Sequence, residues 1–384
     1  MSLPLPIYLD YNSTTPCDPQ VVETMLPFFS GQFGNASSKS HAYGLLADDA
    51  VEQARNLVAD LIHAHESEII FTSGATESIN LAIRGLAATA QSRKHIITIA
   101  TEHKAVLDVC DFLEHHGFEI TVLPVLPNGQ INLHHLEQEI RKDTLLIAAM
   151  YSNNETGVIF PVKEIGEIAS AHGIYFVCDA TQAYGKLPID LREVSIDMMA
   201  FSGHKIYGPK GVGGLYVRKK DPKIKLQPIQ IGGGQERNLR SGTLNVPGIV
   251  GLGKASELAK KNLVDESARL SGLKAKLLSG LSEIPGLVVH GDSLNCQSHV
   301  VNLGFGFDGG DQLLKMISKH LALSSGSACS SARIDPSHVL RAMSVSEALA
   351  LASIRFSLGR MTTDSEIETV IDVIKNTCSK ILNK

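Results

Sequence analysis

The sequence predicts an α/β protein that has a large domain with a mostly parallel central sheet covered by helices, and a smaller C-terminal α+β domain. Two observations lead to this prediction. Short apolar runs alternate with helical patterns between residues 69 and 217, which is typical of βαβ units. After about residue 245 the alternation ends, and a long helical stretch is followed by mixed strands and helices. The length of 384 residues is sufficient for two to three domains.

The predicted strands of the large domain are rich in β-branched residues and almost continuously apolar, as expected when helices cover both faces of a parallel sheet. They cover residues 68–71, 95–100, 119–125, 145–151, 174–180, 197–202 and 213–218. Helices are predicted from about residue 76, over 104–116, near 133–142 and over 162–172. In such sheets, ligands bind at the carboxyl ends of the strands, so the strand ends are where functional residues are expected.

The second region begins with a helix predicted over residues 246–283, in which charged residues are interleaved. Strands are then predicted at 287–291, 299–305 and 353–359, and helices at 309–320, 337–343 and 364–381. Because strands and helices are mixed here without strict alternation, this region is predicted to be of α+β type.

Composition excludes several classes of partner. The net charge is −5 and tryptophan is absent, so neither nucleic acid nor an anionic membrane surface is an expected partner. No apolar run approaches the roughly 20 residues of a membrane span, and the N-terminus "MSLPLPIYLD" lacks the pattern of a signal peptide. The six cysteines are scattered without a C-x-x-C pair, so a zinc site is not indicated, and a reducing, cytoplasmic location is favoured.

Three predicted strand ends carry residues suited to chemistry. In "FTSGATESINLAI" the free N–H groups of a helix start and the hydroxyl of Thr76 form an anion site, or simply an ordinary helix cap. Asp179 in "VCDATQ" either pairs with a ligand nitrogen or caps the next segment. Lys205 in "FSGHKIYGPKG" either forms a Schiff base or is a surface lysine. Together they match the three requirements of pyridoxal 5'-phosphate, namely a phosphate anchor, a partner for the ring nitrogen and a lysine.

Beyond these three sites, the motifs "YLDYNSTTP", "TSGATESINLAI", "TEHKAV", "NNETG", "DATQ", "SGHKIYGPKG", "RSGT" and "SSGSAC" closely resemble the cysteine desulfurases of the class V aminotransferase-like superfamily. The resemblance extends from about residue 7 to about residue 380. "SSGSAC" is similar to the subgroup with the longer cysteine loop, the IscS/NifS type. The resemblance implies a fold type I pyridoxal-phosphate enzyme with a large domain over residues 16–250. Residues 1–15 together with 251–384 would form the small domain.

The resemblance also implies roles for individual residues. Lys205 looks like the lysine that holds the cofactor, Asp179 like the partner of its ring nitrogen, and Gln182 like the partner of its phenolic oxygen. The remaining implied residues are the ring-stacking and proton-shuttling His103, the phosphate contacts Ala75, Thr76, Ser202 and His204, the phosphate contact Thr243 donated by the second subunit of a homodimer, and the substrate-carboxylate contacts Asn154 and Arg355.

Cys329, in the small-residue loop "SSGSACSSAR", looks like the nucleophile that takes sulfur from L-cysteine. The implied products are L-alanine and a persulfide on Cys329, and the implied acceptors are proteins such as an iron–sulfur scaffold that serve cluster and thio-cofactor assembly. No resident metal is expected, although Cys329 could transiently ligate a cluster iron. A loop of ~10 small residues reaches ~17 Å, which suits a carrier that moves sulfur from a pocket to the surface.

Other functions stay open at this point. A selenocysteine lyase or a class V aminotransferase could use the same scaffold, since one fold supports several chemistries. A catalytically silent scaffold would not need Lys205. The chain ends at Asn383 and Lys384, soon after the last predicted helix, whereas housekeeping desulfurases of this type commonly carry a further tail. A specialised or stand-alone sulfur system is therefore an alternative to scaffold docking.

Overall fold

The computed structural model describes residues 5–325 and 335–383. Within these residues the largest sheet has seven strands. In spatial order they are β2 (Ile69–Thr72), β8 (Gly213–Val217), β7 (Met198–Ser202), β6 (Tyr175–Asp179), β5 (Thr144–Met150), β3 (His95–Ile99) and β4 (Glu119–Leu123). The strands from β7 to β4 are parallel, and β8 runs antiparallel to both of its neighbours. The mostly parallel sheet predicted from the sequence is thus confirmed.

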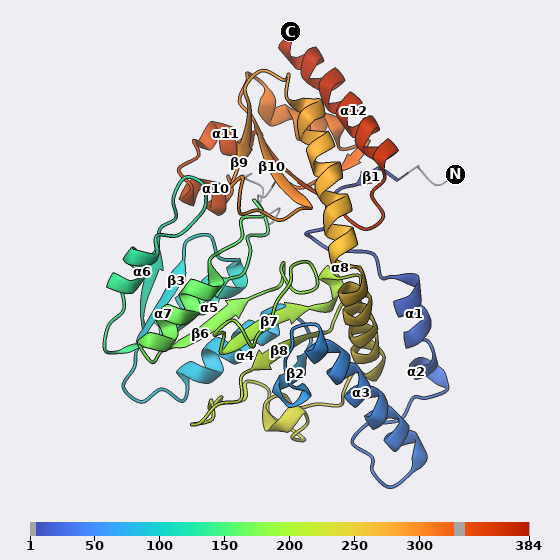
Figure 1. The fold of residues 1–384 in the computed structure, drawn as a ribbon, viewed down its shortest axis with the longest axis vertical. Coiled ribbons are helices and arrows are strands. Elements are labelled where there is room, and N and C mark those ends of the chain that lie inside the picture. Colours follow the sequence, from blue (N-terminus) through green and yellow to red (C-terminus); the bar gives the residue numbers. More distant parts are fainter. Residues whose placement is uncertain (1–4, 326–334, 384) are drawn as a thin grey trace.

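Helices cover both faces of this sheet (Figure 1). One face packs against α4 (Ala75–Ala87) and α5 (Lys104–Glu114), and the other packs against α3 (Ala42–Asp60), α7 (Val162–Ala171) and α8 (Val246–Leu281). Successive residues of one strand point to opposite faces, so Ile96 lies in one hydrophobic core and Ile97 in the other. Burial on both faces explains why the strands are continuously apolar in sequence.

A second, three-stranded sheet lies at the other end of the molecule, in the order β12 (Ser353–Ser357), β10 (Val300–Phe305) and β9 (Leu287–His290). It packs with α12 (Asp364–Leu382) and the second half of α8 into a separate hydrophobic core. Figure 1 shows α8 running continuously from the large sheet to this smaller unit. The division at residues 16–250 stays a prediction, because α8 contributes Leu252 to one core and Leu277 to the other.

The remaining elements are short segments around these two cores. They are β1 (Ile7–Tyr8), β11 (Leu321–Ala322), α1 (Pro19–Met25), α2 (Pro27–Ser30), α6 (Leu133–Gln138), α9 (Leu313–Ile317), α10 (His338–Ala342), α11 (Glu347–Leu351) and the 3-10 helices η1 (Glu66–Glu68), η2 (Gly203–Lys205), η3 (Glu236–Asn238) and η4 (Gly310–Gln312). In the described part of the chain, no helix is both long and apolar enough to span a bilayer.

Most predicted elements lie within a few residues of the observed ones, but no element was predicted before residue 68. The largest omission is α3, whose buried side consists mainly of small residues such as Ala47, Ala54 and Ala59, and also contains Arg55. Such a helix has a weak apolar periodicity. β1 and β11 have two residues each, which is too short for any pattern to register.

Candidate active site

A cavity of about 680 Å³ opens where the carboxyl ends of the large sheet meet the small domain. Of the described residues predicted to have a role, all but Thr243 line it. These are Ala75, Thr76, His103, Asn154, Asp179, Gln182, Ser202, His204, Lys205 and Arg355. Residues up to 280 positions apart in sequence are therefore brought to one place. The cavity has two sides, which differ in how they are built.

The strand-end wall consists of Ala75, Thr76, Asp179, Ser202 and Lys205, each at or just beyond the end of a strand or the turn that follows it. β2 leads through Ser73 and Gly74 into α4, and Gly74 has a φ of +154°, which L side chains rarely adopt. No side chain caps the start of α4. The first N–H groups of this helix are thus available to an anion in the cavity, and the helix dipole favours negative charge there.

Asp179 ends β6 and is 8% exposed. Its Oδ1 accepts a hydrogen bond from the backbone N–H of Thr181 at 2.9 Å and another from the Thr181 hydroxyl. The oxygens of a carboxylate held in this way can still accept a proton or a hydrogen bond from a ligand in the cavity.

Behind Asp179 lies Glu102, whose Oε1 accepts from the N–H of Met150 and which is 0% exposed. Burial raises the pKa of Glu102 well above its usual value, and the negative charge of Asp179 acts in the same direction. The site therefore favours the protonated form of Glu102. The sequence motif "TEHKAV" contains Glu102, but we assigned a role only to the histidine that follows it.

Lys205 ends η2, directly after β7. Its Nζ donates to the carbonyl oxygens of Asn12 and Ser13, the latter at 2.8 Å. Burial, together with the positive charge of Arg355, lowers the pKa of Lys205 to about 8, while Asp10 and Asp179 act in the opposite direction. An amine with this pKa is partly neutral at physiological pH, as nucleophilic attack on an aldehyde requires.

His204, the neighbour of Lys205, is kept neutral by its surroundings. Burial lowers its pKa to about 4, and the charge of Lys205 contributes. Its Nδ1 lies 3.1 Å from the hydroxyl of Thr14. His204 can therefore offer an anion a neutral hydrogen bond rather than a positive charge.

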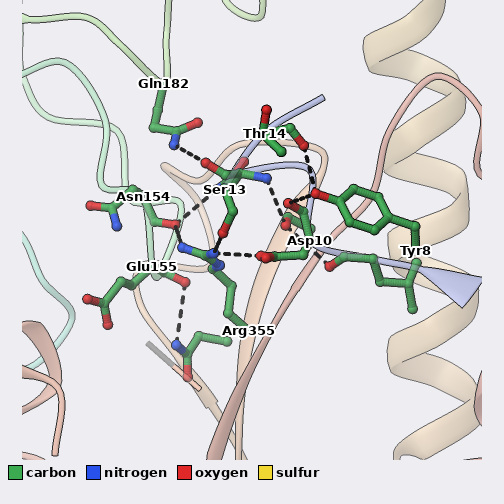
Figure 2. Close-up of polar contacts among 12 residues, drawn as sticks. Tyr8, Asp10, Ser13, Thr14, Asn154, Glu155, Gln182 and Arg355 are labelled. Carbon is green, nitrogen blue, oxygen red and sulfur yellow. Dashed lines mark hydrogen bonds and ion pairs between the residues drawn. The ribbon is translucent and has the colours of Figure 1, made fainter. Parts of the chain in front are cut away.

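The junction wall is the second side of the cavity and consists of Asn12, Ser13, Asn154 and Arg355. Figure 2 shows Arg355 between Asn154, Ser13 and Asp10, which bonds to Arg355 but does not itself line the cavity. Arg355 lies in β12 and is 5% exposed. Its NH2 group donates to Asp10 Oδ1 at 2.7 Å and to Ser13 Oγ at 2.8 Å, and NH1 donates to the backbone carbonyl of Asn154 at 3.0 Å. Nε is buried without a partner among the described residues, and NH1, which has two hydrogens, donates one hydrogen bond within them. Arg355 lines the cavity and so retains donor capacity for a carboxylate there.

Asn12 is the centre of the junction wall and was missed by sequence reasoning. It is 1% exposed; its side-chain Nδ2 donates to the carbonyl of Asn154, and its own carbonyl accepts from Lys205 and from Gln182. The motif "YLDYNSTTP" was noted as part of the resemblance without a role for any of its residues. The signal that could have indicated one is the polar run from Asn12 to Thr15 directly after a short apolar strand.

His103 begins a helix and also lies in the cavity, while its predicted role in proton transfer stays a prediction. It is the N-cap of α5, where its Nδ1 accepts from the N–H of Ala105 at 3.1 Å, and it also lines the cavity. Because Nδ1 is the acceptor, the proton of the neutral ring lies on Nε2.

Thr243 lies outside the cavity, and Cys329 lies outside the described residues. Thr243 is exposed, and Cys329 belongs to residues 326–334. Cys110 and Cys178 are buried in α5 and β6. Burial raises the pKa of both thiols, so neither is an effective nucleophile.

Comparison with known proteins extends these observations to the whole chain. The family model described as Aminotransferase class-V matches residues 7–370. The cysteine desulfurase IscS of Salmonella paratyphi B is 50% identical over 380 residues, which are 98% of this chain and 94% of that protein. A solved NifS-like protein superposes with a TM-score of 0.91 at 36% identity, covering 98% of this chain and 100% of that one.

A further solved structure, described as SspA in complex with cysteine, has a TM-score of 0.81 at 40% identity and covers 92% of this chain and 98% of that one. These matches extend over both the large sheet and the smaller unit, and the family model includes every residue of the two cavity walls. The chain therefore belongs to the class V aminotransferase family and, within it, to the cysteine desulfurases of the IscS/NifS type.

Proposed function

We propose that the protein is a pyridoxal-phosphate-dependent cysteine desulfurase, which converts L-cysteine to L-alanine and keeps the sulfur as a persulfide on Cys329. The observation that carries the proposal is the half-buried Lys205, whose pKa is lowered to about 8 and which shares one cavity with Asp179 and the uncapped start of α4. The enzymes of this family depend on the same cofactor.

The residues present fit pyridoxal phosphate. The N–H groups of Ala75 and Thr76 at the start of α4, with the hydroxyl of Ser202, would hold its phosphate, Asp179 would pair with its ring nitrogen, and Lys205 would bind it covalently. When bound, the cofactor supplies an electron-withdrawing ring that makes the α-proton of an amino acid acidic.

Protons would be moved by Lys205 and His103. Because the pKa of Lys205 is about 8, Nζ can either accept or release a proton near neutral pH. His103 presents a ring that can exchange a proton through Nε2, since Nδ1 is engaged by α5. Arg355 and Asn154 would orient the substrate carboxylate, for which a guanidinium has a matching geometry.

In the sulfur step, the thiolate of Cys329 attacks the sulfur of L-cysteine. An S–S bond forms while the Cβ–S bond of the substrate breaks, and the electron pair of the broken bond stays on the substrate carbon. That carbon gains the proton that Cys329 gave up and leaves as part of L-alanine. The products, L-alanine and a Cys329 persulfide, therefore contain all the atoms of L-cysteine and the thiol.

We further propose a cytoplasmic homodimer in which Thr243 contacts the phosphate bound by the partner subunit. Exposed Thr243 lies outside its own cavity, which is what donation to a second copy requires. A group of exposed apolar side chains supports this proposal, since large patches of this kind mark interfaces. It comprises Val22, Leu26, Phe29, Phe33, Tyr43, Leu45 and Leu46. Sulfur-accepting proteins such as an iron–sulfur scaffold would receive the persulfide.

The test combines a spectrum with a mass measurement. The purified protein with pyridoxal phosphate is expected to show visible absorbance from the lysine-bound cofactor. After L-cysteine is added, peptide mass spectrometry should find one extra sulfur on the peptide containing Cys329. Cys329→Ala should keep the absorbance and lose sulfur transfer. Turnover of L-cysteine by Cys329→Ala, or turnover of selenocysteine alone, would instead indicate a lyase of the alternative type.

A further inference from the structure

Lys186 lies behind Gln182 and has no role in the function proposed above. Its Nζ donates to Oε1 of Gln182 at 2.9 Å and lies 3.4 Å from both Asn12 Oδ1 and His299 Nε2. It does not line the large cavity but a separate small one of about 30 Å³, which Gln182 does not line. Lys186 is therefore placed to act on the cavity through Gln182 and not directly.

The contacts of Gln182 fix which way its amide points. Nε2 donates to the backbone carbonyl of Asn12 at 2.9 Å, and a carbonyl can only accept. The contact with Asn12 therefore excludes the flipped amide. At the other end Oε1 accepts from Lys186, and the two contacts together hold Nε2 at a defined point in the cavity wall. An NH2 group has two hydrogens, so one is left for a ligand in the cavity that Gln182 lines.

The position of Lys186 is costly for a cation. Burial lowers the pKa of Lys186 well below its usual value, and the nearby charges of Lys205 and Arg355 lower it further, while Glu266 opposes them. No carboxylate within the described residues lies at ion-pairing distance from its Nζ. His299, 3.4 Å away, is kept neutral because burial lowers its pKa. The acceptors for half-buried Lys186 are thus the uncharged amide oxygens of Gln182 and Asn12, while His299 Nε2 donates its own hydrogen to Asn12 Oδ1.

We propose that Lys186 is a positioning residue that holds the carboxamide of Gln182 with one Nε2 hydrogen directed into the cavity, where it donates to the ring oxygen of the bound cofactor. The inference rests on the proposed function, because it needs pyridoxal phosphate in this cavity. Without Lys186 the amide is held at one end only. The donor toward the ring oxygen is then lost for part of the time, and the charge distribution of the bound ring changes.

The experiment is a double-mutant cycle of Lys186→Met and Gln182→Leu. Two properties are measured, the dissociation constant of pyridoxal phosphate from the protein and the absorption spectrum of the bound cofactor. Lys186→Met is expected to weaken cofactor binding about tenfold, as for loss of one hydrogen bond to a charged group, and to redistribute the absorbance bands. In the Gln182→Leu background, Lys186→Met should add little, because the group through which it acts is already absent.

Lys254→Met is the matched control. Lys254 pairs with Glu257 on α8, away from the cavity, and its loss should change neither property. Should Lys186→Met fail to fold, Lys186→Gln replaces it in the same cycle, since its shorter side chain no longer reaches Gln182.

Two results would overturn the inference, namely an unchanged dissociation constant and spectrum in Lys186→Met, or effects of the two substitutions that simply add. Failure of the wild-type protein to bind pyridoxal phosphate through Lys205 is a different outcome. It would remove the proposed function itself.

Discussion

The two walls line the same cavity but are built differently. Each residue of the strand-end wall lies at or a few residues beyond the end of β2, β6 or β7, so its position is set by a short stretch of chain and by the sheet beneath it. The junction wall depends on contacts between distant segments, such as the bond between Arg355 and Asp10, which are 345 positions apart. The strand-end wall would thus be formed by the folded sheet alone, whereas the junction wall needs the small unit docked against it.

This difference assigns separate tasks to the walls. The strand-end wall carries the groups that would hold the cofactor, and the junction wall carries the buried guanidinium that would hold the substrate. Substitutions in the strand-end wall should therefore abolish cofactor attachment. Substitutions in the junction wall should leave the cofactor bound and weaken the binding of the substrate. The following predictions test that separation.

The largest effect is expected at Lys205. Lys205→Ala removes both the attachment point of the cofactor and a proton-transfer group, so kcat should fall by about 10³-fold or more. Dialysis followed by absorbance measurement should show loss of the cofactor from the variant and its retention by the wild type. Lys210→Ala is the control, because Lys210 lines the same cavity but follows no strand end. If Lys205→Ala retained the cofactor and the activity, the proposal that the strand-end wall holds the cofactor through Lys205 would be wrong.

The next largest effect is expected at Arg355. Arg355→Lys keeps the positive charge but loses the planar fork, and it leaves Asp10 and Ser13 with fewer donors. We expect KM for L-cysteine to rise about tenfold or more while the spectrum of the bound cofactor is unchanged. Steady-state kinetics and an absorbance scan measure the two. A variant that loses cofactor as readily as Lys205→Ala would show that the walls do not act separately.

Sequence reasoning found the strand-end wall because local patterns encode it. Asp179 ends β6 and Lys205 follows β7, and both strands are predicted clearly by their apolar runs. A charged side chain at the carboxyl end of a parallel strand is well placed to bind a ligand. Asn154 and Arg355 were found only through the family resemblance. Asn12 and Asp10 were not assigned a role. The role of a polar residue after a two-residue strand can be recognised only when the folded chain places Arg355 near it. Long-range proximity has no local signal in a single sequence.

The walls should also influence one another through charge. Burial lowers the pKa of Lys205 to about 8, and Arg355 contributes. Only the neutral amine attacks an aldehyde, so the rate of pyridoxal phosphate binding to the cofactor-free protein should rise with pH and level off above about 8. In Arg355→Met the midpoint should move upward by about one unit. Stopped-flow absorbance measures the rate, with a free lysine derivative titrated in parallel to correct for the cofactor's own ionisation. An unmoved midpoint would mean that Arg355 does not act on Lys205.

The smallest effect concerns the loop that presents Asn154 to the junction wall. Next to it, Glu155 is 4% exposed, and Ser337 Oγ, the N-cap of α10, donates to its Oε2 at 2.5 Å. Burial raises the pKa of Glu155 from 4.5 to about 7, although Ser337 and Arg355 act in the opposite direction. Between these two values the folded protein holds a proton that the unfolded chain has released. Stability from this group is thus fully present below pH 4.5 and is lost as the pH rises through about 7.

Glu155→Gln imitates the protonated carboxyl and can still accept from Ser337, so it should remove this pH dependence. Its free energy of unfolding, measured by urea denaturation, should match that of the wild type at pH 5. At pH 8 it should exceed the wild-type value by at most about 3 kcal/mol. Glu23→Gln, at an exposed position of α1, should show no such divergence. Parallel curves for Glu155→Gln and the wild type would mean that the carboxyl is already ionised in the folded protein. The negative charge of Glu155 would then be balanced by the positive charge of Arg355. This attraction would be a further contact between distant segments, in addition to the hydrogen bonds of the junction wall.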